Sequence, residues 1–272
     1  MQDRIRIENL NEKNIDDLIL VCSSKRLNDP IHQQGIALRK RWLRHLLAKY
    51  GVVAKIAYHN EKPVAQISYY PEEAGPTKTS KRKNVLTILC VYNPTPSAQK
   101  LGIGTRLLRS LIQDAKEQKT CLGNKPCKFI LAKAFNTGEF LSMSDFFEKN
   151  GFLRVPEEQN VLYFPIRGAY ELAKSLGEYK SLVEDRGKAV VFYSSVCQFS
   201  YQFAAKIAGL IREVAPYIEI EMINAWEKPY ESTRRGSCSV IVNAKPVRSF
   251  FMDSEKFKEE VRLALNEKAS KI

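Results

Sequence analysis

Residues 99–104 read Gln-Lys-Leu-Gly-Ile-Gly and lie between an apolar run, 85–91, and an amphipathic stretch, 105–117. The run predicts a buried strand, and the stretch predicts a helix with Leu107, Leu108, Leu111 and Ile112 on one face. A glycine turn that opens a helix exposes main-chain N–H groups without intrahelical partners at the positive end of the helix dipole. Such groups bind phosphate, and glycine lets the ligand approach the backbone. The segment therefore predicts a phosphate-binding loop.

The elements around this loop follow from apolar patterning and turn residues. Residues 52–58 and 63–70 are apolar on either side of a polar turn and predict a hairpin. Residues 128–132 predict a short buried strand, and 144–150 predict a helix that Gly151 closes in the left-handed conformation. Upstream, we expect a first strand near 4–7 and two helices over 14–22 and 33–50. Together these elements predict an α/β (α+β) domain.

The spacing Gln99-x-x-Gly102-x-Gly104, with Thr105 opening the helix, resembles the acyl-CoA motif of the GNAT superfamily of N-acetyltransferases. The segment 146–152, Phe-Phe-Glu-Lys-Asn-Gly-Phe, is similar to the late signature of that family. The resemblance covers residues 1 to about 166. It implies a GNAT fold and acetyl-CoA as the acyl donor, and the early helices would select the acceptor. It also implies a set of acetyl-CoA-binding residues: Cys90, Val91, Gln99, Leu101, Gly102, Ile103, Gly104, Thr105 and Asn136.

The chain departs from the family pattern at the residues that would move protons. Phe147 stands where the family often has a tyrosine that protonates the leaving thiolate, and a phenyl ring has no proton to donate. The loop 91–99 is also longer than usual and carries Pro94 and Pro96. Ser144 and Glu139 are the remaining candidates for catalysis, with a capping or surface role as the alternative for each. The catalytic residues are therefore left open.

Residues 188–272 predict a second, smaller α/β domain. The pattern gives a strand at 189–193, a turn with Cys197, a helix at 201–214, a strand at 218–223, a hairpin within 239–251 and a helix at 254–266. This order resembles a thioredoxin-like domain, with Cys197 at the helix start, where thiolates are stabilised. Cys238 stands where that family has a proline, which argues against thiol exchange but suggests that Cys197 and Cys238 lie close together. A redox pair of Cys197 and Cys238 is therefore one alternative for this domain. Residues 167–187 predict a connecting helix or linker.

The domain order, GNAT-type at 1–166 and thioredoxin-like at 188–272, is similar to that of the YoaP-like acetyltransferases. The implied function is transfer of an acetyl group from acetyl-CoA to a primary amine on a small molecule or a protein. The alternative is a CoA-binding regulatory or redox-sensing module without acetyl transfer, in which the C-terminal domain recruits a partner.

Composition limits the remaining classes. The 272 residues are 44% hydrophobic and 27% charged, as in soluble globular proteins. The sequence has neither a run near the ~20 apolar residues of a membrane span nor a signal-type core, so we expect a cytoplasmic protein. Its six cysteines lack the spacing of a metal site. The net charge of +13 fits a solvated basic surface or the phosphates of CoA, and no motif favours nucleic acid.

Overall fold

The computed structural model describes residues 5–76, 82–134, 142–158, 160–173, 176–236 and 238–266. These residues divide into two compact units, which are described separately. The first unit takes in the described residues of Met1–Leu27, Lys40–Gly75 and Lys81–Ala173. The second takes in those of Asn28–Arg39, Pro76–Ser80 and Lys174–Ile272. No helix in the described ranges is long and apolar enough to cross a membrane.

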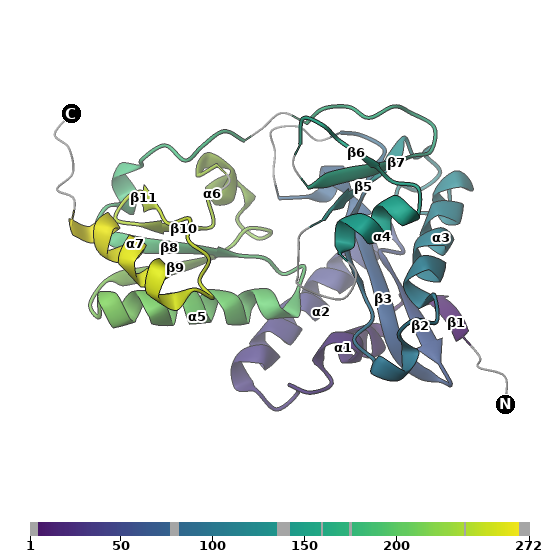
Figure 1. Cartoon of the computed structure of the whole chain (residues 1–272), viewed down its shortest axis with the longest axis horizontal. Helices are drawn as coiled ribbons and strands as arrows, with labels where there is room; N and C mark the ends of the chain where they lie inside the picture. Colours follow the sequence, from purple (N-terminus) through teal and green to yellow (C-terminus); the bar gives the residue numbers. More distant parts are fainter. Residues whose placement is uncertain are drawn as a thin grey trace. The chain divides into compact units, whose positions relative to one another are not determined.

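Within its described residues, the first unit forms a sheet in the order β1-β2-β3-β4-β5-β7-β6 (Figure 1). Neighbouring strands are antiparallel except β4 and β5, which are parallel. The strands are β1 (Ile5–Asn9), β2 (Ala54–His59), β3 (Lys62–Pro71), β4 (Val85–Tyr92), β5 (Phe129–Lys133), β6 (Leu153–Arg154) and β7 (Val161–Pro165). The parallel pair requires a crossover, and α3 (Ile103–Lys116) provides it.

Helices cover both faces of this sheet. The helix α1 (Ile15–Ser23) and the helix α3 both contact the central strand β3. The predicted apolar face of α3 is confirmed: Leu107, Leu108, Leu111 and Ile112 are buried. The other helices of this part of the chain are α2 (Pro30–Tyr50), of which residues 40–50 belong to the first unit, and α4 (Met143–Lys149).

Local signals explain several boundaries in the first unit. The predicted hairpin is confirmed, and its two-residue turn, Asn60 and Glu61, has positive φ at both positions, as the twist of paired strands requires. Gly51 at φ +79° ends α2, and its N–H donates to Leu47 O. Gly151, at φ +87°, ends the late helix as predicted.

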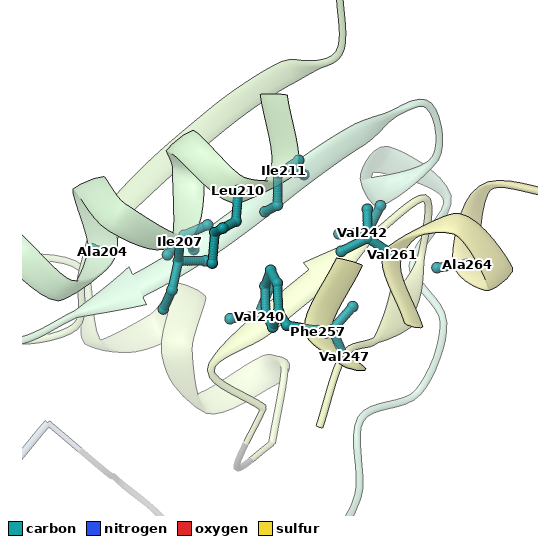
Figure 2. Close-up of a cluster of buried hydrophobic side chains, with 12 residues drawn as sticks. Ala204, Ile207, Leu210, Ile211, Val240, Val242, Val247, Phe257, Val261 and Ala264 are labelled. Carbon is teal, nitrogen blue, oxygen red and sulfur yellow. The ribbon is translucent and has the colours of Figure 1, made fainter. Parts of the chain in front are cut away.

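The second unit forms a separate sheet in the order β11-β10-β8-β9. Its strands β8 (Lys188–Tyr193) and β9 (Glu219–Asn224) are parallel, and β10 (Val240–Val242) is antiparallel to both β8 and β11 (Lys245–Pro246). Its helices are α5 (Gln198–Val214), α6 (Pro229–Arg234) and α7 (Ser254–Asn266). Figure 2 shows the core between α5, α7 and the strands, where Ile207, Val240 and Phe257 meet.

For residues 167–187 the sequence left a connecting helix or a linker open, and the helix is wrong for the described residues, which contain only a 3-10 turn at Val183–Asp185. The apolar positions do not share a buried face, because Leu172 is 60% exposed while Tyr179 packs against the cluster of Val190 and Ile241. Gly177 has φ +76°, which an α-helix does not accommodate.

Side chains set the remaining boundaries in the C-terminal part. The second strand of the predicted hairpin is limited to β11, because the N–H groups of Arg248 and Ser249 donate to the carboxylate of Glu260. Asp253 caps the start of α7, since its carboxylate accepts the N–H of Lys256 at 3.3 Å.

Candidate functional site

The sheet of the first unit opens at the end of its parallel pair. The β4–β5 ladder runs from Val85–Phe129 to Ile88–Ala132, whereas β4 continues to Tyr92 in contact with β3. A β-bulge lies at this point: Ser68 pairs with Cys90 and Tyr69 pairs with Ile88, which leaves Leu89 as the extra residue of β4. Residues 90–92, including the predicted Cys90 and Val91, therefore pair with β3 beyond the end of the ladder to β5.

The predicted loop leads from this strand to the N-terminus of α3. Gly102 is the N-cap residue, at φ +71° and ψ 12°, a left-handed conformation that glycine adopts without strain. The Arg106 N–H donates to Gly102 O at 3.0 Å, so the N–H groups of residues 103–105 precede the first intrahelical bond. The first turn of α3 carries no acidic side chain, and Arg106 is exposed. The geometry and the charge of this turn both favour an anion.

Gly104 lies in a close contact that the sequence did not indicate. An added Cβ would lie 3.4 Å from the ring of Phe146 on α4 and 3.8 Å from Val91 Cγ1 on β4. The start of α3, the side chain of Val91 and the ring of Phe146 are thus neighbours. At Gly102, by contrast, an added Cβ would meet nothing within 4 Å, because the space around this turn is open.

Asn93 organises the extended loop before the glycines. Its side chain donates to Ala98 O at 2.9 Å and accepts the Thr95 N–H at 3.3 Å, while its carbonyl accepts from Gln99 Nε2 at 3.2 Å. The predicted residue Gln99 therefore uses its side chain to close the loop. The sequence signal for this role is the Asn93-Pro94 dipeptide, which is typical of turns.

The two phenylalanines of α4 differ in environment. Phe147, the position matched to the family tyrosine, is fully buried and packs against Phe152 with ring centroids 4.9 Å apart. Phe146 is half-buried and borders Gly104. The helix thus places Phe146, and not Phe147, beside the start of α3.

The predicted catalytic residues remain unsupported. Ser144 lies within the first turn of α4, and the N-cap is Ser142, whose hydroxyl accepts the Asp145 N–H at 3.0 Å. A capping role for Ser144 is therefore wrong. Glu139 and Asn136 lie outside the described residues.

The cysteines have distinct environments. Burial is the main cause that raises the pKa of Cys127 to about 12 and that of Cys121 further, so both thiols stay protonated at neutral pH. Cys197 is exposed and forms the N-cap of α5. Burial also raises the pKa of Cys238, whose thiol donates to Val240 O at 3.0 Å. Cys238 lines a cavity of about 570 Å³ with Arg248 and Phe250, and Cys197 is not among its lining residues.

Metal-ligating side chains do not gather in the described ranges: no group of three or more His, Cys, Asp or Glu residues there is suited to hold a metal ion.

Comparison with protein families gives one match, in which residues 17–125 fit the model described as the acetyltransferase (GNAT) family. No curated protein sequence matches the chain. Similar solved structures include a GNAT family acetyltransferase from Brucella melitensis in complex with acetyl-CoA, at 10% identity and a TM-score of 0.43, over 64% of this chain and 95% of that one. Another is the PaiA N-acetyltransferase from Thermoplasma acidophilum in complex with coenzyme A, at 15% identity and a TM-score of 0.42, over 60% and 99%. Because the sequence identities and TM-scores of these structures are low, the assignment of residues 17–125 to the GNAT family rests on the family match alone.

Proposed function

Since residues 17–125 form a domain of the GNAT acetyltransferase family, we propose that the protein transfers an acetyl group from acetyl-CoA to a primary amine. The observation that carries this proposal is the position of the Gly102 turn and the α3 N-terminus at the end of the loop that follows the part of β4 extending beyond β5. A pyrophosphate bound at the turn would place the rest of the donor next to residues 89–92 of β4.

The chain supplies the binding groups from its main chain. The N–H groups of Ile103, Gly104 and Thr105 would hold the pyrophosphate, and main-chain groups of Cys90 and Val91, beyond the end of the β5 ladder, would pair with the pantetheine arm. Leu101, Gly102 and Gln99 shape the turn, and Asn136 would contact CoA after β5. A backbone N–H near Val91 would stabilise the oxyanion that forms on the thioester carbonyl.

Acetyl transfer requires two proton movements. The amine nitrogen forms a bond to the carbonyl carbon, the carbon–sulfur bond breaks, and the leaving thiolate takes up a proton while the amine loses one. Phe147 cannot supply that proton, and Ser144 and Glu139 stay proposals for this role. A water molecule in the open site would serve equally well as the proton carrier.

The binding loop is tested by substituting Gly102. In Gly102→Val the branched side chain would disfavour the left-handed conformation of residue 102. It would also occupy the open space in which we propose that the phosphates bind. We expect affinity for acetyl-CoA to fall at least about tenfold, measured by isothermal titration calorimetry on the full chain.

Gly123 provides a matched control, because it also has a left-handed φ, +65°, with nothing within 4 Å of an added Cβ. Gly123→Val should cost a similar free energy of folding, roughly 1–2 kcal/mol, and leave the affinity unchanged. Equal affinities for wild type and Gly102→Val would exclude the turn from the site.

A CoA-binding module without acetyl transfer is the second candidate. The burial of Phe147, which leaves α4 without a phenol at the matched position, favours it. Acetyl-CoA binding together with no acetylation across a panel of small-molecule and peptide amines would support the module over the transferase.

For the second unit we propose a thioredoxin-like domain at 188–272, with the GNAT domain at 1–166 and the linker between them, as in YoaP-like acetyltransferases. The strand order β9-β8-β10-β11, with β8 and β9 parallel and α5 between them, supports this proposal. If Cys197 and Cys238 form a redox pair, mild oxidation should produce a disulfide between them. Mass spectrometry that detects no such disulfide would exclude the pair. A cytoplasmic location stays a prediction.

A further inference from the structure

The exposed side of α3 carries basic side chains from its first turn to its last. Arg106, Arg109 and Lys116 are all exposed, and their spacing places them on one face of the helix. Beyond the last turn Arg167 is exposed as well, and its Nη2 donates to Lys116 O at 3.2 Å. We call these four residues the α3 basic face. From Arg106 to Lys116 it extends about 15 Å along the helix axis.

The α3 basic face is not neutralised from within: among the described residues, no carboxylate forms an ion pair with its four side chains. The only acid of α3 itself is Asp114, and its carboxylate lies 2.5 Å from Nζ of the buried Lys55 on β2. Glu117 after the helix pairs with the lysine two residues further. On α7, by contrast, Arg262 pairs with Glu259 three residues earlier. The charge of α3 therefore favours an anionic partner.

The α3 basic face begins at the turn where we propose that the pyrophosphate binds. Arg106 directly follows the N–H groups of residues 103–105, and the space around Gly102 is open. The chemical group that carries the pantetheine arm must therefore lie over this end of α3. In coenzyme A that group is a nucleotide with one further phosphate, on its ribose. One phosphate cannot contact both Arg106 and Lys116, because their positions are about 15 Å apart along the helix.

Resting on the proposed function, we propose that the α3 basic face docks a small acidic protein that carries acetyl-phosphopantetheine, as a donor besides acetyl-CoA. The phosphate of the arm would bind the N–H groups of the Gly102 turn, and the arm would follow β4. The acidic surface of the carrier would lie along Arg109, Lys116 and Arg167. A nucleic acid or an anionic membrane would also match the charge, but neither brings a thioester to the turn.

The transfer from such a carrier needs no further reactant. The amine nitrogen forms a bond to the acetyl carbon, and the bond from that carbon to the sulfur of the arm breaks. The sulfur takes up a proton in exchange for the one that the amine loses, and the thiol stays on the carrier. The α3 basic face contributes to docking alone and touches none of the reacting atoms.

Calorimetric titration of an acetylated carrier into the full chain tests this docking. The probe is an acidic bacterial acyl carrier protein loaded with acetyl-phosphopantetheine. We expect it to bind and excess acetyl-CoA to displace it, because both donors would use the Gly102 turn. The same carrier without phosphopantetheine should bind at least about tenfold more weakly, since it lacks the contacts of the arm.

Reversing the charge of two residues away from the turn tests the surface itself. The double variant Arg109→Glu, Lys116→Glu should weaken binding of the acetylated carrier at least about tenfold and change the affinity for acetyl-CoA less than about twofold. The double variant Arg186→Glu, Arg212→Glu is the matched control, because it changes the net charge equally at two exposed positions of the second unit. It should leave both affinities unchanged.

Three results would contradict the docking: acetyl-CoA binds but the carrier does not, the carrier binds equally well without its arm, or the Arg109→Glu, Lys116→Glu variant binds the carrier as tightly as wild type. Binding of duplex DNA or anionic vesicles in place of the carrier would likewise show that the α3 basic face serves another polyanion. Failure of the proposed function is a separate result, because it appears as the absence of acetyl-CoA binding to the wild type.

Discussion

At the scale of single residues, Asp185 and Arg235 form a buried ion pair in the second unit. Both side chains are fully or almost fully buried, and Arg235 Nη2 lies 2.7 Å from Asp185 Oδ1. Burial alone would raise the pKa of Asp185, but hydrogen bonds from Arg235 and Tyr179 together with the guanidinium charge hold it below its usual value. The buried carboxylate therefore contributes stability only in its ionised form.

Asp185→Asn should lower the free energy of unfolding by about 2–4 kcal/mol, because the buried Arg235 then keeps only the partly exposed Glu231 as a carboxylate partner. The exposed pair Arg248 and Glu178 gives the control, since Arg248→Gln should cost under about 1 kcal/mol. Urea unfolding of the full chain measures both. A loss in Asp185→Asn no larger than in the control would show that the pair adds no net stability.

The pH dependence of this pair has a definite sign. Because the folded pKa of Asp185 is lowered, its contribution is complete above the unfolded value of about 3.9 and is lost as the pH falls through the folded pKa. Wild type should therefore lose more stability than Asp185→Asn between pH 5 and the acid range. Urea titrations at a series of pH values measure the free energy of unfolding of both proteins. If the two free energies changed equally with pH, this prediction would be wrong.

At the scale of elements, α4 is a seven-residue helix whose start depends on one hydroxyl. Ser142 accepts the Asp145 N–H, and the helix ends at Gly151, where the Phe152 N–H donates to Phe147 O. This short helix places Phe146 beside Gly104, so its capping also fixes one wall of the candidate site.

Ser142→Ala should destabilise the first unit by about 1 kcal/mol, since an N–H of the first turn loses its acceptor. Ser144→Ala, two residues further along the same turn, should change stability by less than about 0.5 kcal/mol. Thermal unfolding of the two variants distinguishes the residues. If Ser144→Ala lost more stability than Ser142→Ala, Ser144 and not Ser142 would be the capping residue.

At the scale of the whole molecule, each unit has its own hydrophobic core. The core of the second unit includes Phe257, which is 1% exposed and packs among the residues shown in Figure 2. Leu107 of α3 is fully buried in the first unit. The candidate acetyl-CoA residues that the structure describes belong to the first unit.

Phe257→Ala should therefore destabilise the second unit by about 3–5 kcal/mol and leave the affinity for acetyl-CoA unchanged. Leu107→Ala, the counterpart in the first unit, should reduce both its stability and the affinity, because α3 presents the binding N–H groups. Calorimetric titration alongside unfolding curves measures both properties. A fall in affinity in Phe257→Ala that matches Leu107→Ala would mean that the site depends on both cores.

Much of the first unit was predictable because its signals are local. Alternation and apolar runs located β2, β3, β4 and β5, the spacing of leucines gave the buried face of α3, and Gly51 and Gly151 marked helix ends. The turn at Gly102 and the helix start after it were predictable for the same reason, since both depend only on neighbouring residues. The segment 169–185 failed because its apolar residues contact separate clusters, which periodicity alone cannot show.

The sequence by itself therefore determined most of the longer strands and helices and the glycine turn before α3, which depend on contacts within a few residues. It did not indicate the short elements β6 and α6. Only the tertiary structure decided which side chains surround that turn. The extra residue at Leu89 sets which face of β4 each later side chain occupies, and it assigned Cys90 and Tyr92 to one side and Val91 to the other. The packing of α4 likewise chose Phe146 over Phe147 as the neighbour of Gly104. Register and helix rotation are fixed by partners distant in the chain, so no local pattern specifies them.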